Sequence, residues 1–249
     1  MHYDVISLLP DAVTAYLNAS ILGRATSSGL ISWAAVDLRT FGEGRHRQVD
    51  DSPYGGGAGM VMTPGPLVAA IESCTAAEEG RRTCRILLSP GGERLDRELA
   101  GLLASEYTHL VLVCGRFEGF DERVRDWVDL EVSLGDFVLT GGELGALAIV
   151  DATARLLPGV LGNDESAGEE SFEGPLLEYP QYTRPRAFRG QEVPATLLSG
   201  DHARIARWRR DRAVERTAAR RPERLKDPST LSPEVLDSIK RLDFETPEE

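Results

Sequence analysis

The amino-acid sequence predicts an α/β protein with a mainly parallel sheet, followed by a small all-helical domain. In the first two thirds, short apolar runs flanked by turn residues alternate with helical periodicity, as expected for parallel strands joined by crossover helices. After residue 161 an acidic segment rich in glycine and serine breaks this pattern, and arginine-rich helical periodicity follows. We therefore expect a domain at residues 1–161, a flexible linker at 162–174 and a helical domain at 175–249.

Individual elements follow from the same periodicity. Strands are expected at residues 3–9, 31–38, 85–88, 109–114 and 130–134, which are brief and apolar. Helices are expected at residues 12–26, 66–76, 96–105, 142–157, 201–221 and 232–242. Pro66, Asp96 and Ser232 mark three helix starts, because proline fits the first turn and short polar side chains cap exposed N–H groups.

Composition excludes several classes of protein. No apolar run approaches the roughly 20 residues of a membrane span. Asp4 precedes the first apolar stretch, so the basic start of a secretory signal is missing. The three cysteines form no CxxC pair, so neither a disulfide framework nor a zinc site is indicated. We expect a cytoplasmic protein with no membrane association and no assigned metal ligands.

The charge is unevenly distributed. A net charge of −12 argues against indiscriminate nucleic-acid binding. However, basic residues dominate the segment from Arg204 to Lys226. The sequence thus combines an acidic body with a basic C-terminal segment.

Three predicted strands end in unusual loops, at residues 89–92, 114–119 and 134–142, and each loop contains glycine. In open α/β sheets ligands bind beyond the carboxyl ends of the strands, and glycine lets a ligand approach the backbone. Neither GxGxxG nor GxxxxGK[ST] occurs, which disfavours dinucleotide and Walker phosphate sites. The three loops predict a ligand pocket lined by backbone groups. The alternative is that they are three tight turns with a purely structural role. The glycine-dense segment at residues 50–60 is better explained as a hairpin than as a phosphate-binding nest.

Five segments together resemble the bacterial TrmD family. They are DDSPYGGGAGMVM (50–62), LVLVCGRFEGFDERV (110–124), EVSLGDFVLTGGEL (131–144), DATARLLPGVLG (151–162) and YTRP with VPATLLSGDHARIARWR (within 182–209). The resemblance runs in unbroken order from Met1 to about Arg224. It implies a SPOUT fold with a deep trefoil knot, a rare exception to unknotted topology, and a homodimer with shared active sites. The implied reaction transfers a methyl group from S-adenosylmethionine to N1 of the guanosine 3′ of the tRNA anticodon.

The resemblance also assigns roles to residues. The adenine of S-adenosylmethionine would lie against Leu87, Leu134 and Leu139, while Glu118 and Asp136 would lie near the cationic sulfonium. The full set of implied cofactor-binding residues is Leu87, Leu88, Ser89, Pro90, Gly115, Phe117, Glu118, Gly119, Leu134, Gly135, Asp136, Phe137, Val138, Leu139, Gly141 and Gly142.

Catalysis at N1 requires a base for its proton and a cation near O6. The resemblance implies Glu170 as the base and Arg155 as the cation. The family usually has Asp where this chain has Glu170, and more often Gln at the positions of Gly91 and Arg97. Arg207, Arg210 and Arg216 are the implied tRNA phosphate contacts. Magnesium is a further possible cofactor, without assigned residues.

Two other functions remain open on the sequence. An RNA-binding paralogue could retain the fold and lack turnover because of the Glu170, Gly91 and Arg97 changes. The alternation of strands and helices alone also suits a nucleotide-dependent oxidoreductase, although the missing GxGxxG counts against it. A methyl-transfer assay on unmodified tRNA separates the methyltransferase from the paralogue.

Overall fold

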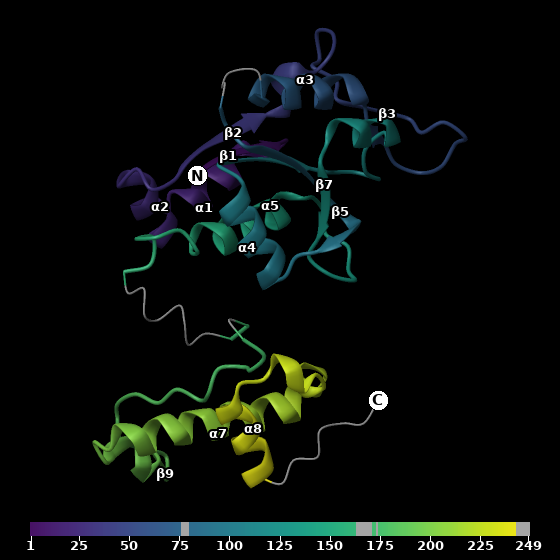
Figure 1. Ribbon diagram of the computed structural model, residues 1–249. Coiled ribbons are helices and arrows are strands. Elements are labelled where there is room, and N and C mark those ends of the chain that lie inside the picture. The colour runs from purple at the N-terminus through teal and green to yellow at the C-terminus, as the bar shows by residue number, and fades with distance from the viewer. Residues whose placement is uncertain (76–79, 163–170, 173, 243–249) are drawn as a thin grey trace. The chain divides into compact units, whose positions relative to one another are not determined.

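The computed structural model describes residues 1–75, 80–162, 171–172 and 174–242 (Figure 1). The chain forms two compact units, unit 1 at Met1–Asn163 and unit 2 at Asp164–Glu249. Among the helices in the described ranges, none combines the length and the apolar character needed to cross a bilayer.

Unit 1 contains a five-stranded parallel sheet with the strand order β2-β1-β6-β5-β7. The sequence predicted a mainly parallel sheet but not the order of its strands. The strands are β1 (His2–Ser7), β2 (Ser32–Asp37), β5 (Thr83–Arg94), β6 (His109–Cys114) and β7 (Leu130–Ser133). Every residue of the central strand β6 is buried, which explains why its sequence is apolar from Leu110 to Cys114. Strand β5 extends beyond its expected end, with a shift in register between Leu88 and Glu93.

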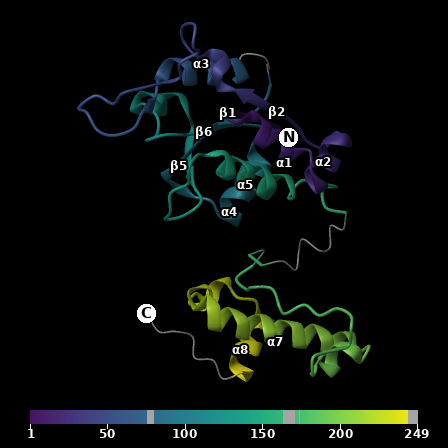
Figure 2. The same cartoon turned by 180° about the vertical axis from the view of Figure 1, so that it is seen from behind.

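Helices cover both faces of this sheet (Figures 1 and 2). One face carries α1 (Pro10–Leu17), α2 (Ser20–Ser27), α4 (Arg97–Glu106) and α5 (Glu143–Ala154), and the other carries α3 (Pro64–Thr75) with the 3₁₀ helices η1 (Leu38–Phe41) and η2 (Glu122–Trp127). Alternate residues of the strands enter two separate apolar clusters, since side chains alternate between the faces.

One helix prediction was wrong. The sequence predicted a single helix at residues 12–26, but the structure has α1 and α2. Ala19 adopts an extended conformation, with φ −91° and ψ 150°, which interrupts the helix. The change of direction lets Leu22 and Ala25 of α2 bury their side chains in the core. The free energy gained by burying these two side chains therefore outweighs the preference of residues 12–26 for one continuous helix.

The expected hairpin near residues 50–60 is present and is attached to a loop after β6. Strands β3 (Asp50–Asp51) and β4 (Val61–Met62) pair antiparallel. The N–H of Glu118 donates to the Met60 carbonyl at 3.0 Å, and that of Met62 donates to the Gly119 carbonyl at 2.9 Å. Gly59 has φ +85°, and a Cβ there would lie 2.5 Å from Glu118. Glycine is thus needed where the hairpin approaches this loop.

After β7 the backbone returns across the ends of β5 and β6. The N–H of Gly142 donates to the Gly115 carbonyl at 2.8 Å. A Cβ on Gly142 would lie 2.8 Å from the Cys114 Cα and 3.0 Å from the Leu88 Cβ. This close crossing places the start of α5 directly beneath the loops that follow β5 and β6.

Unit 2 is built on α7 (His202–Arg220) and α8 (Pro233–Arg241), with η3 (Ala195–Leu198), η4 (Pro222–Leu225) and η5 (Pro228–Thr230). Its apolar core contains Val214, Leu225, Leu231, Val235 and Ile239. The Asp201 and Ser232 side chains accept hydrogen bonds from the first turns of α7 and α8, respectively. These caps explain where both helices begin.

Unit 2 is not all-helical, which corrects the expectation. Strands β8 (Ala187–Phe188) and β9 (Gln191–Glu192) form a short antiparallel hairpin. Arg189 and Gly190 between them have φ values of 50° and 82°. Positive φ at both positions is characteristic of the two-residue turn whose twist matches paired strands. Arginine is uncommon in such a turn, so this hairpin was not predicted from the residue types.

We predict that Gly142→Ala lowers the free energy of unfolding of unit 1 by about 1–3 kcal/mol, because the methyl group would meet backbone that cannot rotate away. Urea denaturation measures this change. Gly162→Ala is the matched control, since a Cβ there meets no atom of the described residues within 4 Å. Equal stability of the Gly142→Ala variant and the wild type would contradict a tight crossing at this point.

Candidate functional site

A pocket of about 370 Å³ opens at the carboxyl ends of β5, β6 and β7. Its walls are the three glycine-containing loops that the sequence singled out. The residues expected to bind cofactor that line it are Leu88, Ser89, Pro90, Gly115, Phe117, Glu118, Gly119, Leu134, Phe137, Val138, Leu139, Gly141 and Gly142. Chain segments that are separate in sequence therefore meet around one cavity.

Three residues of the expected set do not line this pocket. The Leu87 side chain is 0% exposed and packs in the cluster on the α3 face, outside the described pocket wall. Strand alternation sends Leu87 and Leu88 to opposite faces, and Leu88 is the residue that reaches the pocket. Gly135 is buried in a turn where its N–H donates to Ser133 Oγ. Asp136 is exposed and caps no described helix, since Gly142 is the N-cap of α5.

Sequence reasoning missed several lining residues, of which Arg116 is the most informative. Its Nε lies 3.0 Å from Glu143 Oε1, and its Nη2 lies 3.2 Å from Oε2. Ser7 at the end of β1 donates to Oε1 of the same carboxylate at 2.7 Å. A two-pronged arginine–carboxylate contact is strong and fixes orientation. The charged residues within the glycine motifs were a signal that could have found this pair.

The other missed lining residues are Phe120, Glu122, Arg125, Val132, Ser133, Thr140 and Gly145. Arg125 forms a small charged cluster on the wall. Its Nε lies 2.8 Å from Glu122 Oε1, it also pairs with Glu131, and its guanidinium lies 5.4 Å from the Phe120 ring centroid. This cluster joins η2 to the base of β7, and so connects two walls of the pocket.

Cys114 lies beneath the pocket but is not a nucleophile. Burial, together with the nearby Glu143 carboxylate, raises the pKa of its thiol well above the usual value, although Arg116 partly opposes this effect. A thiol held in its neutral form is unreactive. The described pocket residues therefore suit ligand binding through backbone groups and charged side chains better than covalent catalysis.

Backbone strain also occurs at the pocket. Phe117 has φ +58°, in the left-handed region that non-glycine residues rarely adopt. Such a conformation costs on the order of 1–3 kcal/mol and persists where the surrounding contacts enforce it. Its neighbour Glu118 is held by the hydrogen bond to Met60. The hairpin therefore helps to fix the loop in a shape that exposes its backbone to the pocket.

The two expected catalytic residues differ in how far the structure describes them. Arg155 is the C-cap residue of α5, and its N–H donates to the Asp151 carbonyl at 3.3 Å. Glu170 lies outside the described residues. Of these two residues the structure therefore describes only Arg155, which lies at the end of the helix whose first residue, Glu143, pairs with Arg116 of the pocket wall.

The three expected RNA-contacting arginines have different environments on α7. Arg207 is exposed, whereas Arg210 and Arg216 are half-buried. Arg216 Nη1 donates to the Glu178 carbonyl at 3.2 Å, so this side chain stabilises unit 2 internally. Trp208 is half-buried, with its ring centroid 6.2 Å from that of Tyr182. Of the three arginines, Arg207 has the side chain most available to a phosphate.

Comparison with known proteins places these features in a family. Residues 1–227 match the family described as tRNA (Guanine-1)-methyltransferase TrmD. The chain is 57% identical over 220 residues to a tRNA (guanine-N(1)-)-methyltransferase of Myxococcus xanthus, covering 88% of each chain. It is 51% identical over 249 residues to one of Moorella thermoacetica, covering 98% of this chain and 99% of the relative. With its parallel sheet, its glycine-lined pocket and these similarities along nearly its whole length, the chain belongs to the TrmD family of tRNA (guanine-N(1)-)-methyltransferases.

Proposed function

We propose that this chain, a tRNA (guanine-N(1)-)-methyltransferase, takes its methyl group from S-adenosylmethionine and acts on the guanosine directly 3′ of the anticodon. The observation that carries the proposal is the 370 Å³ pocket lined by the family's glycine motifs. Its volume lies within the range of roughly 300–1,000 Å³ typical of small-molecule sites. Because retained motifs line the pocket, a catalytically active enzyme is favoured over an RNA-binding paralogue.

The pocket residues fit this methyl donor. Leu134, Leu139 and Val132 offer apolar surface for a purine ring. Gly115, Gly119 and Gly141 leave backbone N–H and C=O groups accessible for hydrogen bonds to the ring edge and the ribose. Glu118 brings negative charge to the pocket wall, which suits a cationic ligand. When bound, S-adenosylmethionine supplies an electrophilic methyl group.

We assign the proton transfer to Glu170 and charge stabilisation to Arg155. N1 of guanine carries a proton at neutral pH, so a positioned base must remove it while negative charge develops on O6. A carboxylate can accept the proton, and a guanidinium can stabilise the developing charge. Arg155 matches the family motif, and Glu170 keeps a carboxylate where the family usually has Asp, which supports these roles. Arg155 follows α5, which is anchored at its other end by the Arg116–Glu143 pair.

We also propose that the crossing at Gly142 belongs to a trefoil knot. Two observations support this topology. The segment after β7 runs against Cys114 and Leu88 at the ends of the two neighbouring strands, and α5 then packs on α4 and α1. A chain that reaches the far side of a sheet through its own loops becomes knotted.

We further propose that unit 1 binds the cofactor and that unit 2 binds tRNA.

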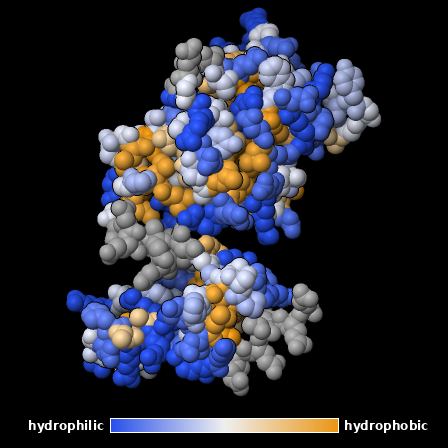
Figure 3. Space-filling model, in the orientation of Figure 1, coloured by the Kyte–Doolittle hydropathy of each residue, from blue (hydrophilic) through white to orange (hydrophobic). Residues whose placement is uncertain are grey.

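The exposed apolar rim of the pocket supports a homodimer. Val138 and Phe137 line the pocket and are 81% and 54% exposed, and Leu144, in the first turn of α5, is 61% exposed. Figure 3 shows further hydrophobic residues, in orange, at the surface of unit 1. Clustered exposed apolar side chains mark protein interfaces in soluble proteins. We place this dimer in the cytoplasm, where the three unpaired cysteines would stay reduced.

The wild-type protein is expected to transfer label from S-adenosylmethionine to N1 of that guanosine in unmodified tRNA. Glu170→Gln should lower the single-turnover rate about 10²–10⁴-fold, because it removes the basic oxygen but nearly keeps the shape. Glu169→Gln, its neighbour in sequence, is the matched control and should retain the wild-type rate. Absence of label transfer by the wild type would refute the proposed function. A wild-type rate for Glu170→Gln would refute only the assignment of the base.

For RNA binding, Arg207→Ala should lower the slope of log affinity against log salt by about 0.7–0.9, the value expected for one lost phosphate contact. Filter binding across a salt series measures this slope. Arg24→Ala, which removes an exposed arginine of α2, is the matched control and should leave the slope unchanged. Arg216→Ala should instead destabilise unit 2 by about 1 kcal/mol, because Arg216 bonds the Glu178 carbonyl. An unchanged slope for Arg207→Ala would place the RNA-binding surface elsewhere.

Sedimentation at micromolar concentration should give a dimer, with twice the chain mass of 27.2 kDa. Leu144→Glu should shift the protein to monomer, because it places a charge on the most exposed apolar position of α5. Leu30→Glu is the matched control at an exposed leucine away from the pocket rim. A monomeric wild type with full activity would contradict the shared site.

A further inference from the structure

Four polar residues form a row at the amino-terminal end of the sheet in unit 1. Ser32 on β2 pairs in register with His2 on β1, His2 pairs with His109 on β6, and His109 pairs with Thr83 on β5. Register partners on neighbouring parallel strands point to the same face, so the four side chains lie side by side. Asp4 follows His2 by two residues and shares that face. Four strands thus bring five polar side chains together.

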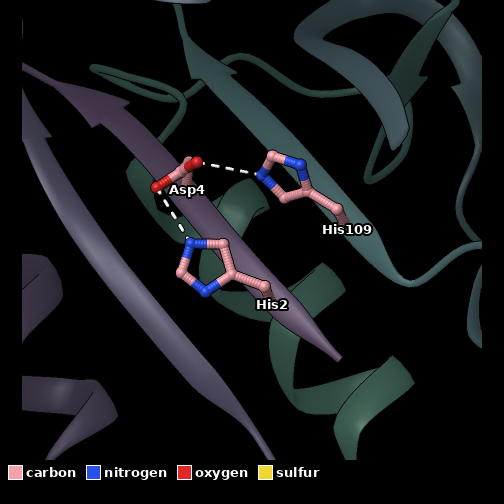
Figure 4. Close-up of side chains that lie close together, drawn as sticks. All are labelled: His2, Asp4 and His109. Carbon is pink, nitrogen blue, oxygen red and sulfur yellow. Dashed lines mark hydrogen bonds and ion pairs between the residues drawn. The ribbon is translucent and has the colours of Figure 1, made fainter. Parts of the chain in front are cut away.

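The Asp4 carboxylate lies between the two imidazole rings (Figure 4). Its Oδ2 lies 2.9 Å from Nε2 of His109, and its Oδ1 lies 3.3 Å from Nε2 of His2. One ligand atom from each residue can be chosen so that all three lie within 4.8 Å of one another. Ligands about 2.0–2.1 Å from a tetrahedral zinc ion are about 3.3 Å apart, so modest ring rotations would accommodate an ion between them.

The second ring nitrogen of each histidine, Nδ1, forms a hydrogen bond with a hydroxyl group. Ser32 Oγ lies 2.8 Å from Nδ1 of His2, and Thr83 Oγ1 lies 3.1 Å from Nδ1 of His109. Histidines that bind metals almost always have such an outer partner, which fixes the ring and its tautomer. A hydroxyl can donate or accept. It donates to Nδ1 when Nε2 carries a proton, and it accepts from Nδ1–H when Nε2 binds an ion. The Nδ1 atom of each histidine therefore keeps its hydrogen bond whether or not an ion is bound.

The electrostatic surroundings favour a cation. Asp4 is the acidic residue of this cluster, and its two carboxylate oxygens face the two imidazole rings. Cys74, in the last turn of α3, adjoins Asp4. A helix C-terminus adds partial negative charge. Because Asp4 is only 7% exposed, solvent screens this negative charge weakly.

We propose that His2, Asp4 and His109 form a binding site for a divalent transition-metal ion, and that Zn²⁺ is the ion best suited to two imidazoles and one carboxylate. The His2 side chain is 19% exposed, which leaves a path for the ion and for a water as fourth ligand. The ion would join the start of β1 to β6. Ser7, which bonds Glu143, is five residues from His2, or about 16 Å along the strand. The site is therefore separate from the pocket, and its role is structural.

Calorimetry on metal-stripped protein without an affinity tag tests this proposal, with Zn²⁺ as the probe. We expect one ion per chain, a higher melting temperature with Zn²⁺, and a visible absorption band of tetrahedral Co²⁺ on substitution. Asp4→Asn and His109→Asn should abolish binding. Thr83→Val should weaken it about 10–100-fold, because the outer partner of His109 is lost. His202→Asn, which changes an exposed histidine of α7, is the matched control and should bind as the wild type does.

Absence of Zn²⁺ binding by the wild type would overturn the proposal, as would unchanged affinity in Asp4→Asn. If the Asp4 and His109 variants fail to fold, His2→Gln and Thr83→Val decide the matter, and wild-type affinity in both would overturn it. Mg²⁺ should give no comparable stabilisation, since it prefers oxygen ligands. Equal stabilisation by Mg²⁺ would contradict a nitrogen-based site. Cofactor affinity, measured in parallel, should not change in any of these variants.

Discussion

The Glu143 carboxylate joins three parts of unit 1 that are distant in sequence. It accepts hydrogen bonds from Ser7 at the end of β1 and from Arg116 in the loop after β6, and it lies in the first turn of α5. A carboxylate in a first helical turn is favoured by the helix dipole. Removing one partner of a buried ion pair typically costs about 3–5 kcal/mol, because a charge remains without compensation. The position of α5, and with it the floor of the pocket, depends on this contact.

The close backbone crossing at Gly142 complements that ion pair. It requires the absence of a side chain at Gly142, where Cys114 and Leu88 leave no room for a Cβ. The same lack of side chains exposes backbone N–H and C=O groups to the pocket. Glycine in these loops therefore serves two purposes, since it allows the chain to cross itself and it lets a ligand reach the backbone. A larger residue would disturb folding and binding together.

The two ends of the parallel sheet have different chemistry. The carboxyl ends carry glycine loops and an open pocket, as expected where strands point their final residues toward a common edge. At the amino ends, His2, His109 and Asp4 form a compact polar cluster that fixes the outermost residues of β1. Between them, the central strand β6 is buried along its whole length and is apolar after His109. This separation allows the amino end to be rigid without restricting the ligand site.

The sequence by itself determined the fold class, the strand β6 with both its ends, and the caps at Asp96 and Ser232, because these depend on local periodicity and short-range hydrogen bonds. Its motifs also determined the family. Only the tertiary structure decided which side chains reach the pocket. Leu87 and Leu88 are indistinguishable by type, yet strand alternation directs Leu88 alone to the ligand side. The Arg116–Glu143 pair and the row from Ser32 to Thr83 likewise arise from strand order and register. These long-range pairings leave no periodic signal in a single sequence.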